Sequence, residues 1–114
     1  MSNVTNDTDR FGALDIQCER DGDRVVIALA GELDMHSSGR VADELHSAEA
    51  TDADRIVLDL SRLEFMDSSG LRVIVHADAR SRCNGDRLEL IRGPAAVQRV
   101  FELTALLDRL PFAD

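Results

Sequence analysis

Residues 55–71 read RIVLDLSRLEFMDSSGL, and the fold is decided in this stretch. Its first part, Arg55–Leu60, is a mostly apolar run of branched side chains, which is typical of a buried strand. A connecting loop is expected over Ser61–Asp67. A helix is expected from about Ser68 to Cys83, because Asp and Ser are favoured N-cap residues and an apolar face follows them. The residues of that face are Leu71, Ile74, Val75 and Ala79.

Two strands and a helix are expected before this stretch. Leu14–Cys18 alternates apolar and polar residues as a half-buried strand does, and Arg24–Ala30 is apolar enough for a buried strand. The turn residues Asp21-Gly22-Asp23 between them indicate a hairpin. A helix follows, with Ser37 or Ser38 as its expected cap and its end at about Ala50. Its apolar stripe is expected to consist of Val41, Ala42, Leu45 and Ala48 or Glu49.

One strand and one helix are expected after it. Arg87–Ile91 has the composition of a strand, and Gly93-Pro94 introduces a helix with the proline in its first turn. The last segment, Leu106–Phe112, is amphipathic and fits either kind of element. The apolar stripe of the last expected helix consists of Val97, Val100, Phe101 and Thr104.

The element order β-β-α-β-α-β-α predicts an α/β fold. Strands that alternate with helices indicate parallel crossovers, and the opening hairpin adds an antiparallel pair. We therefore expect one domain over residues 11–114, with a mixed sheet of four to five strands packed against helices. Residues 1–10 are polar and acidic, and we expect them to form a flexible tail.

The composition excludes several classes of function. The chain has 22 acidic and 13 basic residues, a net charge of −9, and no Lys. Nucleic-acid binding is not expected, because it needs clustered cations, and a Walker-type phosphate site needs a Lys. No apolar run approaches the ~20 residues of a membrane span, and no signal peptide is recognisable, so we expect a cytoplasmic protein without membrane attachment.

The cysteine count bounds the redox and metal chemistry. Cys18 and Cys83 are too few for a disulfide framework or a four-ligand zinc site. We expect both to be reduced, part-buried thiols. No metal site and no cofactor are indicated by the sequence.

The candidate functional residues lie in Asp67-Ser68-Ser69-Gly70. Asp67 or Ser68 is expected to cap the helix, which leaves its first backbone N–H groups exposed. A phosphoryl group on a serine here would be favoured by the helix dipole and by those N–H groups, whereas Asp67 would repel it. Plain helix capping explains the same residues, so both interpretations stay open. A catalytic serine is not expected, because no G-x-S-x-G motif is present and no histidine has a spacing that implies a triad.

Three segments occur in one order along the chain and together resemble a known family. In chain order, the three segments are AGELD at 30–34, FMDSSGL at 65–71 and VFELT at 100–104. The second of them is preceded by IVLDLS at 56–61. This set resembles the STAS domain, and more narrowly the bacterial anti-sigma factor antagonists. The resemblance covers about residues 12–112. The DSSG segment alone would be unspecific, and the three segments together make the resemblance specific.

The resemblance implies a function in transcription regulation by partner switching. Family members bind an anti-sigma factor that is a serine kinase, and this binding releases the sigma factor. The kinase then phosphorylates the first serine of the motif, here Ser68, the complex dissociates, and a serine phosphatase restores the unmodified protein. The protein would be a monomeric binding partner and substrate, and not an enzyme. The residues expected at the partner contact are Asp34, Asp67, Ser69, Gly70 and Arg72.

The chain departs from the family at three places, and one alternative function remains open. Residues 35–39 read MHSSG where the family often has small apolar residues or Pro, and Ala105 replaces a common Gly. Arg72 stands where a small residue is common, and it could pair with a phosphate or touch the partner. The alternative is a ligand-sensing or scaffold STAS domain that binds nucleotide or another small anion in a signalling assembly. Retention of Ser68 with Asp67 and Gly70 favours the antagonist.

Overall fold

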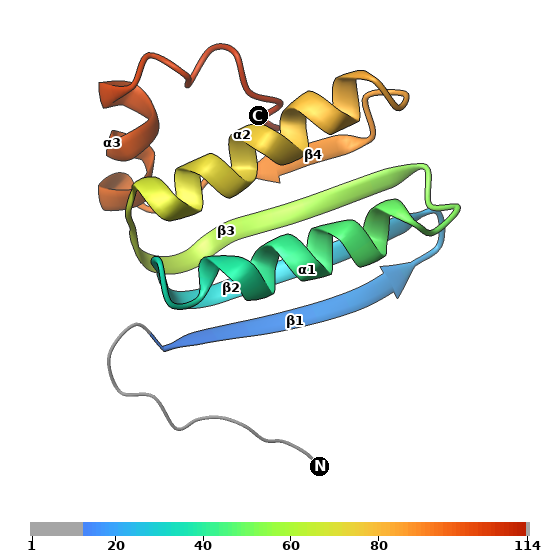
Figure 1. The fold of residues 1–114 in the computed structure, drawn as a ribbon, viewed down its shortest axis with the longest axis horizontal. Helices are drawn as coiled ribbons and strands as arrows, with labels where there is room; N and C mark the ends of the chain where they lie inside the picture. Colours follow the sequence, from blue (N-terminus) through green and yellow to red (C-terminus); the bar gives the residue numbers. More distant parts are fainter. Residues whose placement is uncertain (1–12, 114) are drawn as a thin grey trace.

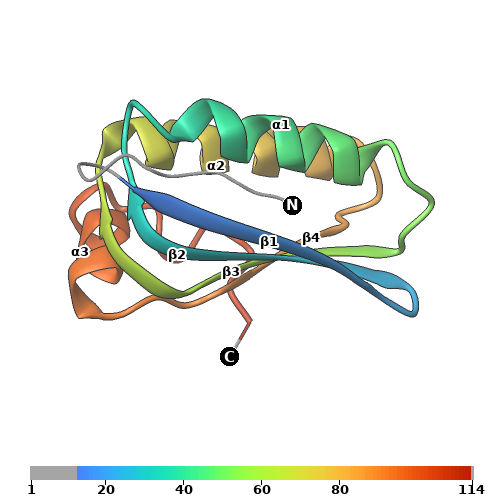
Figure 2. The same ribbon diagram turned by 90° about the horizontal axis from the view of Figure 1, so that it is seen from below.

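A four-stranded sheet with two helices on one face and a third helix at one end forms the structure (Figures 1 and 2). This is a computed structural model, and it describes residues 13–113. The expected tail, residues 1–10, lies outside the described residues. The expected element order is confirmed. The elements are β1 (Leu14–Asp21), β2 (Arg24–Leu33), α1 (Ser38–Glu49), β3 (Arg55–Met66), α2 (Ser68–Arg82), β4 (Leu88–Ile91) and α3 (Ala95–Leu103).

The strands lie in the sheet in the order β1-β2-β3-β4. β1 is antiparallel to β2, and β2, β3 and β4 are parallel to one another. α1 connects β2 to β3 and α2 connects β3 to β4, and both helices cover the same face of the sheet (Figure 2). The carboxyl ends of β2, β3 and β4 therefore meet at one end of the molecule, where α3 also lies (Figure 1).

The core lies between this face of the sheet and the two covering helices. Alternate residues of the central strands point inward, because side chains of a strand alternate between its faces. They pack against the apolar stripes of the helices. Fully buried members of this core include Ile27, Leu29, Leu58, Leu60, Leu90, Val41, Leu45 and Ile74.

β3 is longer than the sequence predicts. The prediction of a loop over Ser61–Asp67 is wrong, because the strand continues to Met66. Its pairing with β2 contains two register shifts, and at each of them β3 carries one extra residue. Each bulge reverses the alternation of side chains, so buried residues recur every third position, at Leu60, Leu63 and Met66. That spacing does not read as a strand in the sequence.

The helices agree with the expected ranges, and several residues lie elsewhere than expected. In α2, Ala79 is exposed, whereas Ala77 and Asp78 are buried. The two cysteines, expected to be part-buried, are both free and exposed. In α3, Gln98 takes the buried position in place of Val100, which is half-buried, and Thr104 is the C-cap.

The last segment covers the free side of β4. Leu90 forms a bridge with Phe112, and two backbone hydrogen bonds tie it to Pro111 and Ala113. The Phe112 ring packs edge-on against Phe101, with centroids 5.0 Å apart. One edge of the sheet is thereby covered, and β1 forms the other edge.

Candidate functional site

The candidate site lies where β2 and β3 end side by side. Leu33 pairs with Met66 at the last position of both strands, and the Asp67 N–H donates to the Leu33 carbonyl at 3.2 Å. This contact brings the loop after β2 next to the start of α2. The carboxyl end of parallel strands is the usual place for binding sites in α/β folds.

Asp67 caps α2. Its Oδ1 accepts hydrogen bonds from the backbone N–H groups of Ser69 at 2.8 Å and Gly70 at 3.4 Å. Its backbone is extended, and its carbonyl accepts the Leu71 N–H at 3.2 Å. Capping of this kind stabilises a helix by about 1 kcal/mol. Asp67 is thus the cap, out of the two residues that the sequence left open.

The cap changes what the first turn of α2 offers to an anion. The first N–H groups of α2 were expected to be exposed. This is wrong for those of Ser69 and Gly70, because both donate to the Asp67 carboxylate. A phosphate on Ser68 would compete with a carboxylate for these donors. Helix capping and a modification site therefore share the same four residues without excluding each other.

Ser68 is the first residue of α2 and is exposed, whereas Ser69 is half-buried. Among residues 13–113, no hydrogen bond to the Ser68 hydroxyl is formed. Gly70 is buried, and a Cβ at this position would lie 2.6 Å from Leu33 Cγ and 2.8 Å from Met66 Cγ. The role that the structure gives Gly70 is close packing of the first helical turn on the strand ends.

The loop after β2 is folded around Asp34. Its Oδ1 accepts the N–H groups of His36 at 2.9 Å and Ser37 at 3.2 Å, and the Ser37 hydroxyl at 3.2 Å. The single proton of the Ser37 hydroxyl is shared between this carboxylate and the Glu32 carbonyl at 3.0 Å, and the hydroxyl oxygen accepts the Asp34 N–H at 3.0 Å. Ser37 is the N-cap residue of α1 by position, but its side chain caps no helical N–H. The carboxylate of Asp34 therefore fixes the loop after β2 by binding the backbone N–H groups of that loop.

Gly31 allows β2 to lie close to the start of β1. Its φ is +109°, and a Cβ would lie 2.4 Å from the Ala13 carbonyl oxygen. Only glycine adopts this conformation without strain. The glycine of the AGELD segment thus has a backbone role.

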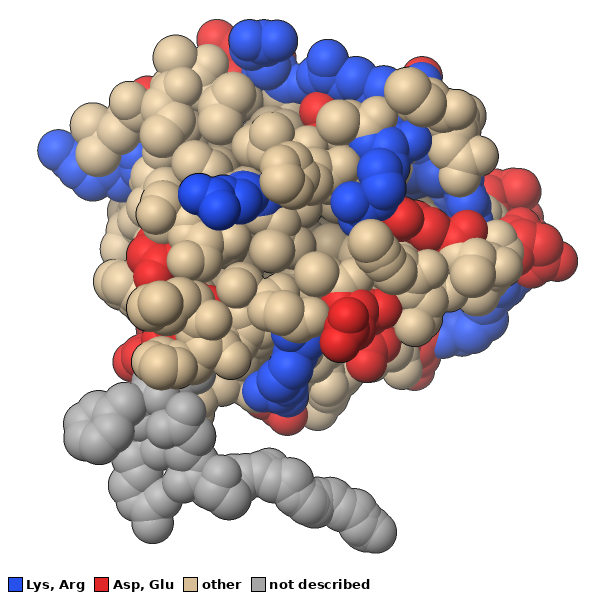
Figure 3. All heavy atoms as spheres, in the orientation of Figure 1, with Lys and Arg blue, Asp and Glu red and all other residues tan. Residues whose placement is uncertain are grey.

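Two apolar side chains at the site were not singled out by the sequence analysis. Met35 is 72% exposed and Phe65 is 48% exposed, and they flank the strand ends from which Ser68 follows. Phe65 reaches the surface because the second bulge of β3 reverses the alternation just before it. Seen from the helix-covered side, this end of the molecule is mostly uncharged surface with isolated charges (Figure 3). Each of the two strand ends thus carries one large apolar side chain that is exposed to solvent.

Arg72 lies one turn beyond Ser68 on α2 and is exposed. Within the described part of the chain its guanidinium has no hydrogen bond or ion pair. The other two arginines of this helix are engaged: Arg80 binds Glu49 at 2.9 and 3.0 Å, and Arg82 binds Asp78 at 3.0 Å. Arg72 is thus the cation of α2 that remains available.

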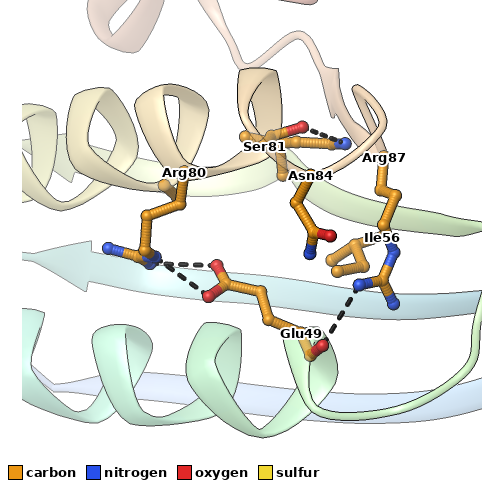
Figure 4. A pocket seen from close by; sticks show the side chains of 8 residues that line it. Glu49, Ile56, Arg80, Ser81, Asn84 and Arg87 are labelled. Carbon is orange, nitrogen blue, oxygen red and sulfur yellow. Dashed lines mark hydrogen bonds and ion pairs between the residues drawn. The ribbon is translucent and has the colours of Figure 1, made fainter.

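Two hollows in the surface of the described residues are lined by residues other than Ser68 and its neighbours. One of about 20 Å³ lies between the last turns of α1 and α2 and the start of β4, with Glu49, Arg80 and Arg87 in its wall (Figure 4). It has room for about one water molecule. An open hollow of about 370 Å³ lies on the uncovered face of the sheet, lined by Arg24, Val57, Glu89, Ile91, Arg92 and Ala113.

Residues 13–113 contain no group of three metal-ligating side chains that could hold an ion. No helix in this range is long and apolar enough to cross a membrane.

The chain is similar to several proteins of known family. Residues 16–111 match the family described as Mlab, STAS domain. The anti-sigma-B factor antagonist of Listeria monocytogenes is 33% identical over 90 residues, which are 79% of each chain. The anti-sigma F factor antagonist of Paenibacillus polymyxa is 31% identical over 102 residues, 89% of this chain and 87% of that one.

The fold is similar to solved structures of the same kind. The unphosphorylated anti-sigma factor antagonist SpoIIAA superposes with a TM-score of 0.73 at 28% identity, covering 88% of this chain and 89% of that one. The phosphorylated form of this Bacillus cell fate determinant gives a TM-score of 0.67 at 27% identity, covering 88% and 92%.

Proposed function

Since the chain belongs to the STAS-domain family of anti-sigma factor antagonists, we propose that it binds an anti-sigma factor that is a serine kinase and so releases a sigma factor. The kinase phosphorylates Ser68, and phosphorylation ends the complex. A serine phosphatase then restores the binding form. In this cycle the protein acts as a cytoplasmic binding partner and substrate, and not as an enzyme.

The observation that carries the proposal is the presentation of Ser68. The serine is exposed at the start of α2, and its neighbour Asp67 holds the backbone around it in place. Ser69, the other hydroxyl of the motif, is half-buried. A kinase has to reach the acceptor oxygen with its bound nucleotide, so the accessible serine is the better substrate.

The surface around Ser68 supports partner binding. Met35 and Phe65 supply exposed apolar area on the two strand ends, and Asp34 holds the Met35 loop in one conformation. Apolar and aromatic side chains near the centre of an interface contribute most of its affinity. We place Asp34, Asp67, Ser69 and Arg72 at the edge of this contact, and Gly70 beneath it.

Phosphorylation can switch this contact off without a change of fold. It adds about −1.5 to −2 charges at a place where Asp67 is already negative. Burying that charge in the interface is costly, because a charge taken out of water needs a partner of opposite sign. A difference of about 3 kcal/mol lowers the affinity more than a hundredfold.

The test is a phosphorylation assay with candidate anti-sigma kinases and ATP, followed by mass spectrometry. We expect phosphate on Ser68 in the parent protein and in the matched control Ser69→Ala, and none in Ser68→Ala. The affinity for the kinase should fall at least a hundredfold in the phosphorylated protein, measured by calorimetry. Binding to no candidate kinase and phosphate on no residue would contradict the proposal.

A further inference from the structure

We propose that Arg72 binds the phosphate on Ser68 within the same helix, so that phosphorylation also withdraws this arginine from the partner surface. The inference rests on the proposed phosphorylation of Ser68. Of the two roles open to Arg72, pairing with a phosphate and contact with the partner, the first applies to the phosphorylated protein.

The geometry of α2 brings the two side chains together. Ser68 and Arg72 are both exposed and lie four residues apart in one continuous helix. Side chains at this spacing lie on the same face, about 5–6 Å apart at Cβ. An anion on the N-terminal side of the cation is the favourable orientation of such a pair.

Several groups of α2 that could compete for the phosphate already have partners. The nearest backbone donors, the N–H groups of Ser69 and Gly70, already bind Asp67. Arg80 and Arg82, the other cations of α2, bind Glu49 and Asp78. Arg72 has no such partner among residues 13–113, and its guanidinium presents five N–H donors that suit a phosphate.

The pair gives phosphorylation two effects at one site. The phosphate blocks the Ser68 hydroxyl, and the guanidinium that faced outward turns toward the phosphate. A partner that contacts both residues in the unmodified protein therefore loses the Ser68 hydroxyl and the Arg72 guanidinium together. Because the change involves only side chains on one helix turn, the backbone of α2 stays as it is.

The test places phosphoserine at position 68 during synthesis of the full chain, so that no kinase is needed. The second pKa of the phosphate is then measured by ³¹P NMR titration. An unperturbed phosphate has a value of about 6. We expect Arg72→Gln to raise this pKa by about 0.15–0.4 unit, because the dianion loses its cation. The difference should shrink in 1 M salt, where charges are screened within about 3 Å.

Arg109→Gln is the matched control. It removes the same charge from an exposed arginine near the far end of α2, where Arg82 binds the Arg109 carbonyl, about 20 Å along the helix from Ser68. It should leave the phosphate pKa unchanged. An equal pKa in the parent and in Arg72→Gln, or equal shifts in the two variants, overturns the pairing. Failure of the proposed function would appear elsewhere, as a kinase that does not bind or modify Ser68.

Discussion

Gly70 sets how closely α2 approaches the ends of β2 and β3. A Cβ here would meet Leu33 and Met66 side chains at 2.6–2.8 Å. We expect Gly70→Ala to lower the free energy of unfolding by about 1–3 kcal/mol, because the strand ends must move to admit it.

The matched variant is Gly39→Ala in α1, where a Cβ meets nothing within 4 Å. It should raise the stability by about 0.5–1 kcal/mol, because alanine is the better helix former. Urea unfolding measures both variants. Equal effects of the two substitutions would mean that Gly70 is not required for packing.

Ala105 occupies a position that suits glycine. Its φ is +59°, and it follows α3 in a Schellman arrangement: the Leu106 N–H donates to Phe101 and the Ala105 N–H to Glu102. An alanine in this conformation costs about 1 kcal/mol relative to glycine. We therefore expect Ala105→Gly to stabilise the protein by up to about 1 kcal/mol, measured as a higher urea midpoint.

The control for this substitution is Ala96→Gly, an exposed position inside α3 with ordinary helical geometry. It should destabilise by about 1 kcal/mol. A loss of stability in both glycine variants would show that Ala105 is not strained.

Cys18 is held in its protonated form. Although part of Cys18 is exposed, its thiol packs toward α1 beside Glu44. The resulting desolvation, and then the hydrogen bond and charge contact with Glu44 at 2.9 Å, raise the pKa of this thiol to about 12. Because the thiolate is the reactive form, iodoacetamide at pH 8.5 should modify Cys18 at least tenfold more slowly than an unstructured cysteine peptide. Peptide mass spectrometry on a Cys83→Ser background measures the rate.

The same pKa predicts how stability depends on pH. The folded pKa lies above the unfolded one, so the contribution of Cys18 to stability is full below the unfolded value of about 8.5. It decreases as the pH rises toward 12. Glu44→Gln should speed the alkylation, and an unchanged rate in that variant would rule out the contact with Glu44 as a cause.

At the scale of elements, Arg87 holds the end of α1 against the start of β4. Its guanidinium donates to three carbonyls, those of Ala53 at 2.9 Å, Glu49 at 3.1 Å and Thr51 at 2.9 Å. A lysine cannot reproduce this planar fork. We expect Arg87→Lys to lower the free energy of unfolding by about 1–2 kcal/mol.

Arg24→Lys is the comparison, because Arg24 makes one exposed ion pair with Asp21 at 3.3 Å. Exposed pairs contribute little, so its effect should stay within about 0.5 kcal/mol. The two variants are compared by urea unfolding. If Arg87→Lys left the free energy of unfolding unchanged, the charge of Arg87 and not the shape of its guanidinium would be what stabilises the protein.

Elements with a regular pattern could be predicted from the sequence. α2 has an N-cap acid, an apolar stripe and a terminating Asn-Gly, and its range was expected to within one residue. The second half of β3 could not be predicted, because two bulges turn its alternation into a spacing of three. A bulge depends on the partner strand, and the sequence of one strand does not reveal it.

The residues of the candidate site could be predicted from the sequence, but their contacts with residues distant in the sequence could not. Asp67 as a cap follows from local chemistry, and the exposure of Ser68 follows from its place ahead of the apolar face. Phe65 was expected in a connecting loop, and its exposure in β3 results from the bulge just before it. The burial of Gly70 depends on Leu33, which is distant in the sequence.

At the scale of the whole molecule, the two edges of the sheet differ. The edge at β4 is covered by Phe112, over which Arg92 also lies, 5.2 Å from the ring centroid. Among residues 13–113, no strand pairs with the outer edge of β1. The face of β1 that points away from the helices carries Asp15 and Glu19. If two copies paired antiparallel through β1 around Gln17, these acids would oppose each other. Charges of this kind prevent edge-to-edge pairing.

We therefore expect a monomer, and a measurable change when the acids are removed. The double substitution Asp15→Thr with Glu19→Thr should populate a species of twice the chain mass in light scattering at high concentration. The charge-matched pair Glu102→Gln with Asp108→Asn, both exposed and away from β1, should stay monomeric. A dimer in the control would mean that net charge, and not the edge, keeps the copies apart.

The order of strands in the sheet is also their order in the chain. Each strand pairs with the one synthesised just before it, so the sheet can grow outward from the β1–β2 hairpin without waiting for a distant segment. The hairpin turn between β1 and β2 closes a short loop, whereas the parallel pairings of β3 and β4 each close a longer crossover that contains a helix, which takes more time. On a ribosome, β1 and β2 can pair while the rest of the chain is still being made. The hairpin is thus the part of the sheet that can form before the rest of the domain exists.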